Sequence, residues 1–138
     1  MRKRTQAREF ALQVLYQIDV TGDSYDLSLD NFWAAHPQED LDEGVKVFTG
    51  ELVKGVRDNL ATIDKKISQY AANWQLERMA VVDRNILRIS TCELIFRQDI
   101  PPKVSINEAI ELAKKYSGLE ASKFVNGILD KIKLEQNK

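Results

Sequence analysis

The chain is poor in residues that cross-link, bind metals or react. Its 138 residues include one cysteine, Cys92, and one histidine, His36. A single cysteine forms no disulfide within the chain, and this usage is typical of proteins in a reducing, intracellular compartment. One histidine without a second histidine or a cysteine cluster is a poor basis for a metal site. We therefore predict neither a metal nor a cofactor, and interpret Cys92 as a small core residue.

Long apolar runs and catalytic signatures are missing as well. No uninterrupted apolar stretch approaches the roughly 18 residues of a membrane span, and the N-terminus lacks the apolar segment of a signal peptide. We expect a soluble, cytoplasmic protein. The chain has no glycine-rich phosphate loop, no GxSxG or HExxH motif, and no isolated pair of buried carboxylates. We interpret it as a binding protein and not an enzyme.

The charges of the chain nearly cancel. Twenty basic and 21 acidic residues give a net charge of -1, so the molecule as a whole does not attract a polyanion. A nucleic-acid site would have to be a local patch. The N-terminus offers one, because Arg2, Lys3, Arg4 and Arg8 precede the first acidic residue. The residues alone leave two interpretations open, a solvated basic end or an RNA-binding patch.

Apolar residues recur at helical spacing along nearly the whole chain, and no stretch alternates over the length of a strand. With 43% hydrophobic and 30% charged residues, the chain is predicted to form one domain, 1–138, with a substantial core. We expect an all-α, compact bundle of about seven helices. A helix break is predicted near Thr62, followed by an apolar stripe that ends at Trp74.

The segment 79–97 is predicted to be a central helix, buried on nearly every side. Its apolar arc on a helical wheel consists of Met79, Ala80, Val81, Val82, Ile86, Leu87, Ile89, Cys92, Leu94 and Phe96. The polar stripe consists of Arg84, Arg88 and Thr91. Asp83 and Glu93 interrupt the apolar arc. Because an unpaired buried carboxylate is costly, each must be paired within the chain or lie at an edge that a partner covers.

Two local sequence features predict a helix boundary and a close contact between helices. Ser105 and Glu108 match a capping box, which predicts a helix with Ser105 as its N-cap and Gly118 as its stop. The pair Asn126-Gly127 lies inside a helical pattern, where glycine costs about 1 kcal/mol relative to alanine. We infer that another helix passes close to Gly127.

Four sequence blocks resemble the NusB family of transcription antitermination factors. In chain order they are RE at 8–9 with ALQVLYQ at 11–17, VDRNILRI at 82–89 with EL at 93–94, INEAIELAK at 106–114, and KFVNGILD at 123–130. The last two blocks are specific, and the four span almost the whole chain. The resemblance implies an all-helical fold of two helical subdomains.

The resemblance also implies a function. A NusB-like protein binds the boxA element of nascent ribosomal RNA together with NusE, a ribosomal protein of the small subunit. The complex lets RNA polymerase read through terminators in ribosomal operons. Single-stranded RNA is held by cations on phosphates and by planar side chains on unstacked bases. The predicted RNA-binding residues are Arg2, Lys3, Arg4, Arg8, Tyr70, Arg88, Lys123 and Phe124.

For the partner protein, the resemblance implies that NusE contacts Tyr16 and Asp83. Tyr70 and Phe124 have a second interpretation as core aromatics, and Arg88 as a member of an internal ion pair. Residues 21–41 match no family motif, and both a monomer and a homodimer are open.

Two other functions remain open, a helical protein-binding adaptor and an accessory subunit of a ribosomal RNA methyltransferase. The second arises because the same helical module is similar to the N-terminal domain of ribosomal RNA cytosine methyltransferases.

Overall fold

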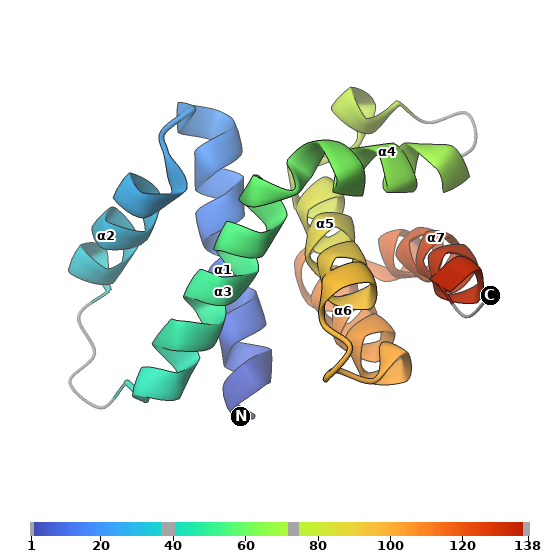
Figure 1. Cartoon of the computed structure of the whole chain (residues 1–138). Helices are drawn as coiled ribbons and strands as arrows, with labels where there is room; N and C mark the ends of the chain where they lie inside the picture. The colour runs from blue at the N-terminus through green and yellow to red at the C-terminus, as the bar shows by residue number, and fades with distance from the viewer. Residues whose placement is uncertain (1, 37–40, 72–74, 137–138) are drawn as a thin grey trace.

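Figure 1 shows the computed structural model of the chain, which describes residues 2–36, 41–71 and 75–136. Within these ranges the chain forms helices and no strand. In chain order they are α1 (Lys3–Thr21), α2 (Tyr25–Ala35), α3 (Glu43–Asp58), α4 (Leu60–Tyr70), the 3-10 turn η1 (Leu76–Arg78), α5 (Val81–Phe96), α6 (Pro102–Tyr116) and α7 (Leu119–Gln136). The all-α prediction is confirmed. Trp74 lies outside the described residues.

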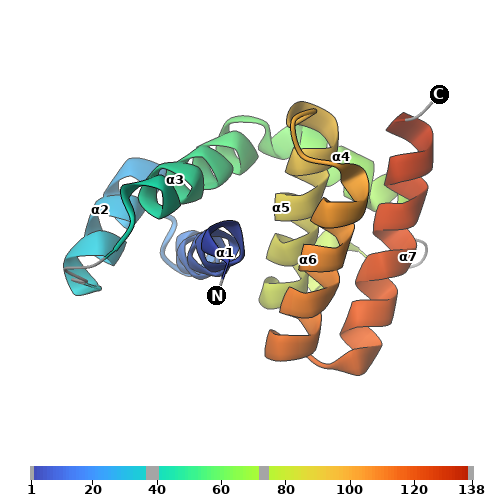
Figure 2. The ribbon, with the colours of Figure 1, turned by 90° about the horizontal axis from the view of Figure 1, so that it is seen from below.

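The helices form two groups that meet at α5. Helices α1, α2 and α3 pack together on one side, and α4, α5, α6 and α7 on the other (Figures 1 and 2). Both α1 and α3 pack against α5, which joins the groups. The prediction of two helical subdomains is therefore confirmed, while a single folding domain over 1–138 stays a prediction. None of the described helices combines the length and apolarity that a membrane crossing needs.

Helix α5 is the buried centre of the fold. Nine consecutive residues, from Asn85 to Glu93, are buried, which requires neighbours on every side of the helix. Helices α1, α3, α4, α6 and α7 supply them. The last turn departs from the prediction, because Phe96 is 44% exposed. It is the last residue of α5.

Residues with special backbone roles set the helix ends. Gly22 ends α1 at a positive φ of 76°, and Gly118, with a φ of 120°, follows α6 and donates its N–H to the Ala113 carbonyl. The break between α3 and α4 lies at Asn59, whose side-chain amide donates to the Gly55 carbonyl at 2.8 Å. This break precedes the predicted position by three residues.

The capping-box prediction is wrong. Helix α6 begins at Pro102, because proline lacks an N–H and its fixed φ suits the first helical position. Ser105 is therefore inside the helix, buried, with its Oγ 2.8 Å from the Oγ of Ser90. The Glu108 carboxylate accepts a hydrogen bond from the Thr5 hydroxyl at 2.7 Å instead of closing a cap.

The inference of close packing at Gly127 is also wrong. A Cβ atom added to Gly127 would meet no heavy atom of the described residues within 4 Å. The close approach lies at Gly55 of α3, where an added Cβ would come 3.0 Å from the Cys92 sulfur. The unfavourable glycine of α7 therefore leaves an open stretch of backbone on the surface.

Candidate nucleic-acid interface

A groove of about 290 Å³ lies between α4 and α7. We call it the Phe124 groove, and its lining residues are Tyr70, Ala71, Lys123, Phe124, Gly127, Ile128 and Lys131. Lys123, Gly127 and Lys131 follow one another at four-residue intervals, so they lie in a row along one face of α7. The groove therefore combines two cations, two aromatic rings and the open backbone at Gly127.

The two aromatic residues are neither fully buried nor fully exposed. Tyr70 and Phe124 are half-buried and pack against the core with part of their surface. The remainder faces the groove, so both of the predicted interpretations, core residue and ligand platform, describe part of each ring. An exposed ring face beside lysines is the arrangement that holds unstacked bases and their phosphates.

Glu135 of α7 contacts two residues of α4, Lys66 and the groove residue Tyr70. Its carboxylate lies 2.8 Å from the Lys66 ammonium, and it accepts a hydrogen bond from the Tyr70 hydroxyl. Burial, and after it the negative charge of Glu135, raise the pKa of Tyr70 above its usual value. Tyr70 is therefore neutral and held in place at neutral pH.

Arg8 does not reach the surface. Its side chain is 3% exposed, and its guanidinium donates to both carboxylate oxygens of Glu93 at 2.8 and 2.9 Å. Glu108 lies 3.7 Å away and adds a second negative charge. Arg8 thus satisfies Glu93, one of the two carboxylates in the apolar arc of α5, and links α1 to α5 and α6.

Arg88 has a similar internal role at the opposite end of the interface between α1 and α5. It donates to both oxygens of Asp64 at 2.8 and 2.9 Å and to Asp19 at 3.0 Å. Burial opposes ionisation of Asp19, but hydrogen bonds from Asn85 and Arg84 and the charge of Arg88 keep its pKa below the usual value. The ion-pair interpretation of Arg88 matches this geometry, and RNA contacts by Arg8 or Arg88 stay predictions.

The other N-terminal cations gather around a second pocket of about 450 Å³. Lys3 pairs with Asp42 at 2.8 Å, and the Arg4 guanidinium lies 4.4 Å from the centre of the Phe48 ring. Arg2 is exposed next to them. This pocket shares no lining residue with the Phe124 groove, and the N-terminus and α7 lie apart in Figure 1. The structure brings Tyr70, Lys123 and Phe124 together, but not with the N-terminal cations.

The predicted partner-binding residues lie on α1 and α5. Tyr16 is 45% exposed, and Asp83 lines a pocket of about 340 Å³. We call it the Asp83 pocket, and its lining residues are Arg78, Met79, Ala80, Asp83, Glu120, Ala121 and Phe124. One carboxylate oxygen of Asp83 is buried and has no hydrogen-bond partner among the described residues. Phe124 lines this pocket as well as the groove, so the two sites adjoin.

Sequence reasoning missed three residues, namely Lys131, which lines the groove, and Lys66 and Glu135, which form the ion pair between α4 and α7. The signal for two of them was present, since 131 and 135 continue the four-residue spacing from Lys123. Lys66 had no such signal, because only the packing of α4 against α7 brings it to Glu135.

An all-helical scaffold with a groove of aromatic and basic side chains is typical of a helical RNA-binding protein. A family model described as "NusB family" matches residues 5–133. The transcription antitermination protein NusB of Desulfitobacterium hafniense is 47% identical over 136 residues, covering 98% of this chain and 90% of the relative. The corresponding protein of an Anaeromyxobacter species is 49% identical over 130 residues, with 94% and 89% covered. The chain belongs to the NusB family.

Solved structures agree with this assignment. NusB of T. maritima is 38% identical and superposes with a TM-score of 0.87, covering 98% of this chain and 92% of that one. A chain in a crystal structure of antitermination factors NusB and NusE in complex with double-stranded RNA is 29% identical. It also superposes with a TM-score of 0.87, with 98% of each chain covered.

Proposed function

We propose that this protein is a transcription antitermination factor that acts in the cytoplasm. It binds the boxA element of nascent ribosomal RNA together with NusE and promotes read-through by RNA polymerase in ribosomal RNA operons. It acts by binding and not by catalysis. Family membership and the solved complex of a relative with NusE and RNA support this role. The observation on this chain that carries it is the Phe124 groove, which joins stacking surfaces to cations.

The RNA-binding role assigns a separate task to each part of the groove. The ring of Phe124 stacks on an unpaired base, and Tyr70 supports a neighbouring one. Lys123 and Lys131 contact phosphates from the same face of α7. The exposed backbone at Gly127 lets the strand pass close to the helix, since glycine has no side chain and a Cβ there would meet no described residue within 4 Å.

An RNA titration tests the groove directly. Phe124→Ala should weaken binding of a short single-stranded boxA RNA by about 1–3 kcal/mol, the typical loss for one stacked base. Lys123→Ala should weaken binding and lower the slope of log affinity against log salt by about 0.7, the value for one phosphate contact. Leu134→Ala is a matched control, because this apolar side chain is 63% exposed on α7 outside the groove. Equal affinities for wild type and Phe124→Ala would refute the stacking role.

The N-terminal cations are tested separately, because they lie around a different pocket. Changing Arg2, Lys3 and Arg4 together to alanine should lower RNA affinity and flatten its salt dependence if they contact phosphates. An unchanged salt slope would show that they form a solvated basic end.

The partner-binding role rests on Asp83 and Tyr16. A buried carboxylate oxygen without a partner is costly, so a donor from an incoming protein would satisfy it. Asp83→Lys should leave the isolated fold nearly intact but weaken NusE binding by a few kcal/mol. Because Phe124 borders both sites, the gain in RNA affinity on adding NusE should also shrink.

Calorimetry with purified NusE decides the partner role. Unchanged NusE affinity in Asp83→Lys, or a variant that unfolds, would return Asp83 to a purely internal role. If this protein binds partner proteins but has no affinity for RNA, the adaptor alternative is favoured. Co-purification of a methyltransferase in place of NusE and RNA polymerase would favour the accessory-subunit alternative.

A further inference from the structure

We propose that Glu135 lowers the RNA affinity of the Phe124 groove by neutralising Lys66 at the end of the basic row. This inference rests on the proposed function and adds an affinity-setting residue to it. Lys66 then acts as a phosphate contact that Glu135 withholds in the RNA-free protein, and that becomes available when the negative charge of Glu135 is removed by substitution.

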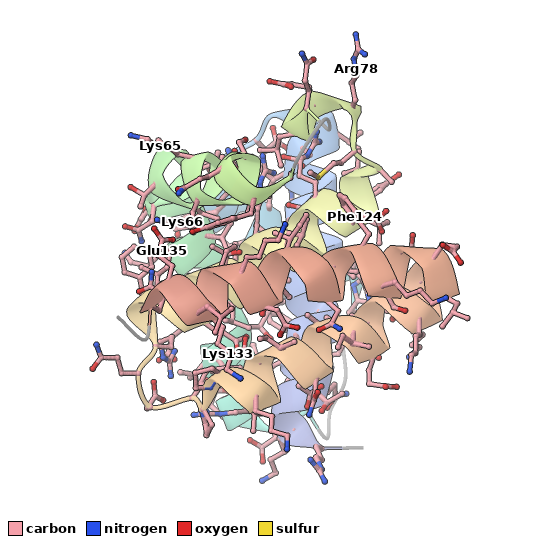
Figure 3. The ribbon with its side chains drawn as sticks, turned by 90° about the vertical axis from the view of Figure 1, so that its right-hand side faces the viewer. Lys65, Lys66, Arg78, Phe124, Lys133 and Glu135 are labelled. Atoms are coloured by element: carbon pink, nitrogen blue, oxygen red, sulfur yellow. The ribbon has the colours of Figure 1, made fainter. Side chains whose placement is uncertain are left out.

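The position of Glu135 follows from helix geometry. It lies four residues after Lys131 and so continues the row of Lys123, Gly127 and Lys131 along α7. In this row the last position carries the opposite charge. Figure 3 shows Glu135 beside Lys66 of α4, while Phe124 lies further along α7 on the same edge. A strand that followed the row past Lys131 would meet this carboxylate.

The ion pair has a geometry that keeps Lys66 occupied. The Lys66 ammonium lies 2.8 Å from a Glu135 oxygen, and the two side chains are only 22% and 29% exposed. Partial burial weakens the screening that makes most exposed ion pairs negligible. A phosphate that approached Lys66 would have to displace a carboxylate already in contact and would be repelled by it.

Glutamine is an informative replacement at position 135. Its amide oxygen can still accept the hydrogen bond that Tyr70 donates to Glu135 in the native protein, so the ring keeps its support. The negative charge, in contrast, is gone, and Lys66 becomes available to phosphate. Glu135→Gln therefore separates the charge of Glu135 from its role in positioning Tyr70.

The experiment measures affinity for single-stranded boxA RNA as a function of salt, using the full chain. The variants are Glu135→Gln, Lys66→Met and the double variant. The control is Glu111→Gln on α6, which removes the same charge from an exposed pair with Lys114 outside the groove. A thermal melt of each variant checks that it is folded.

Glu135→Gln should bind RNA more tightly, by roughly threefold to tenfold at low salt. The slope of log affinity against log salt should steepen by about 0.7, because one more phosphate contact forms. In the Lys66→Met background the same change should leave the slope as it was. Lys66→Met alone should change it little, since Lys66 is already neutralised.

Several results would overturn the inference while the proposed function stands. The first is that Glu135→Gln binds RNA with the same affinity as Glu111→Gln, and the second is that it binds RNA more weakly than the wild type. The third is that Glu135→Gln steepens the salt slope as much in the Lys66→Met background as in the wild type. If Glu135→Gln does not fold, Lys66→Met alone still tests the inference. A fall of about 0.7 in the slope of log affinity against log salt would overturn it, because Lys66 would then already contact phosphate in the native protein. A wild-type protein that binds no RNA, with or without NusE, would overturn the proposed function and this inference together.

Discussion

Replacing Arg8 by methionine should destabilise the protein far more than a change at the exposed N-terminal cations. In the native structure the Arg8 guanidinium holds the Glu93 carboxylate through two hydrogen bonds, and the side chains are 3% and 1% exposed. Methionine keeps much of the apolar stem but removes the charge and the donors. The Glu93 carboxylate would then lose both of these donors where water does not reach it.

Breaking a buried pair in this way costs about 3–5 kcal/mol. The whole free energy of unfolding of a domain is about 5–15 kcal/mol, so Arg8→Met should be only marginally stable. The double variant Arg8→Met/Glu93→Leu should recover at least about half of the loss, because no charge is then buried at that point. Glu108 still has its hydrogen bond from Thr5 in the double variant.

Urea unfolding followed by circular dichroism at neutral pH measures these differences. Arg4→Met is the matched control, since its guanidinium is 52% exposed and lies 3.9 Å from Asp99, and it should cost less than about 1 kcal/mol. The reasoning fails if Arg8→Met is no less stable than Arg4→Met. It also fails if removing Glu93 as well brings no recovery, because the loss would then come from packing and not from a stranded charge.

Four further predictions concern stability and reactivity. Gly127→Ala should raise the free energy of unfolding by about 0.5–1 kcal/mol, because the added methyl group would meet no described residue within 4 Å on this helix. Gly55→Leu should lower it by about 1–3 kcal/mol, because the new side chain would press on the Cys92 sulfur. Urea titrations check both, and a stabilised Gly55→Leu would show that α3 can move away. The lowered pKa of Asp19 means that its stabilisation is present above the pKa of the unfolded chain and lost as pH falls through the folded one. Asp19→Asn should therefore lower the melting temperature at neutral pH and flatten its fall in acid; a parallel fall would point to other carboxylates. Burial raises the pKa of the Cys92 thiol to about 11, so a thiol reagent at about pH 8 should label the protein in urea but not in its native state, and rapid native labelling would contradict this.

The central helix could be predicted from the sequence, but the fate of its carboxylates could not. Periodicity locates α5 because burial on every side leaves an apolar arc that few other structures explain. Asp83 and Glu93 look alike within that arc. Glu93 is satisfied by Arg8, which is 85 positions away in the chain, whereas one Asp83 oxygen has no hydrogen-bond partner among the described residues. Only tertiary contacts distinguish the two cases.

Predictions from local sequence patterns were wrong where the same residues make tertiary contacts instead. The side chains of Ser105 and Glu108 have the spacing of a cap, but the helix already starts at Pro102 and both face other helices. Gly127 was correctly identified as unusual, yet its cost does not reveal whether a helix or a ligand approaches it. For the groove, the KFVNGILD block contains Lys123 and Phe124, while Tyr70 joins them only because α4 crosses α7.

The charges along the interface of α1 and α5 change sign from one end to the other. Arg8 of α1 meets Glu93 near one end, and Asp19 of α1 meets Arg84 near the other, so the two helices run antiparallel. A slide of α1 by one helical turn in either direction would separate Arg8 from Glu93. In one of these directions it would also bring Arg8 toward Arg97. The reversed polarity therefore specifies the alignment of the two subdomains more than it adds stability. A chimera in which α1 comes from another family member should assemble correctly only if that helix has a basic residue at position 8 and an acidic residue at position 19.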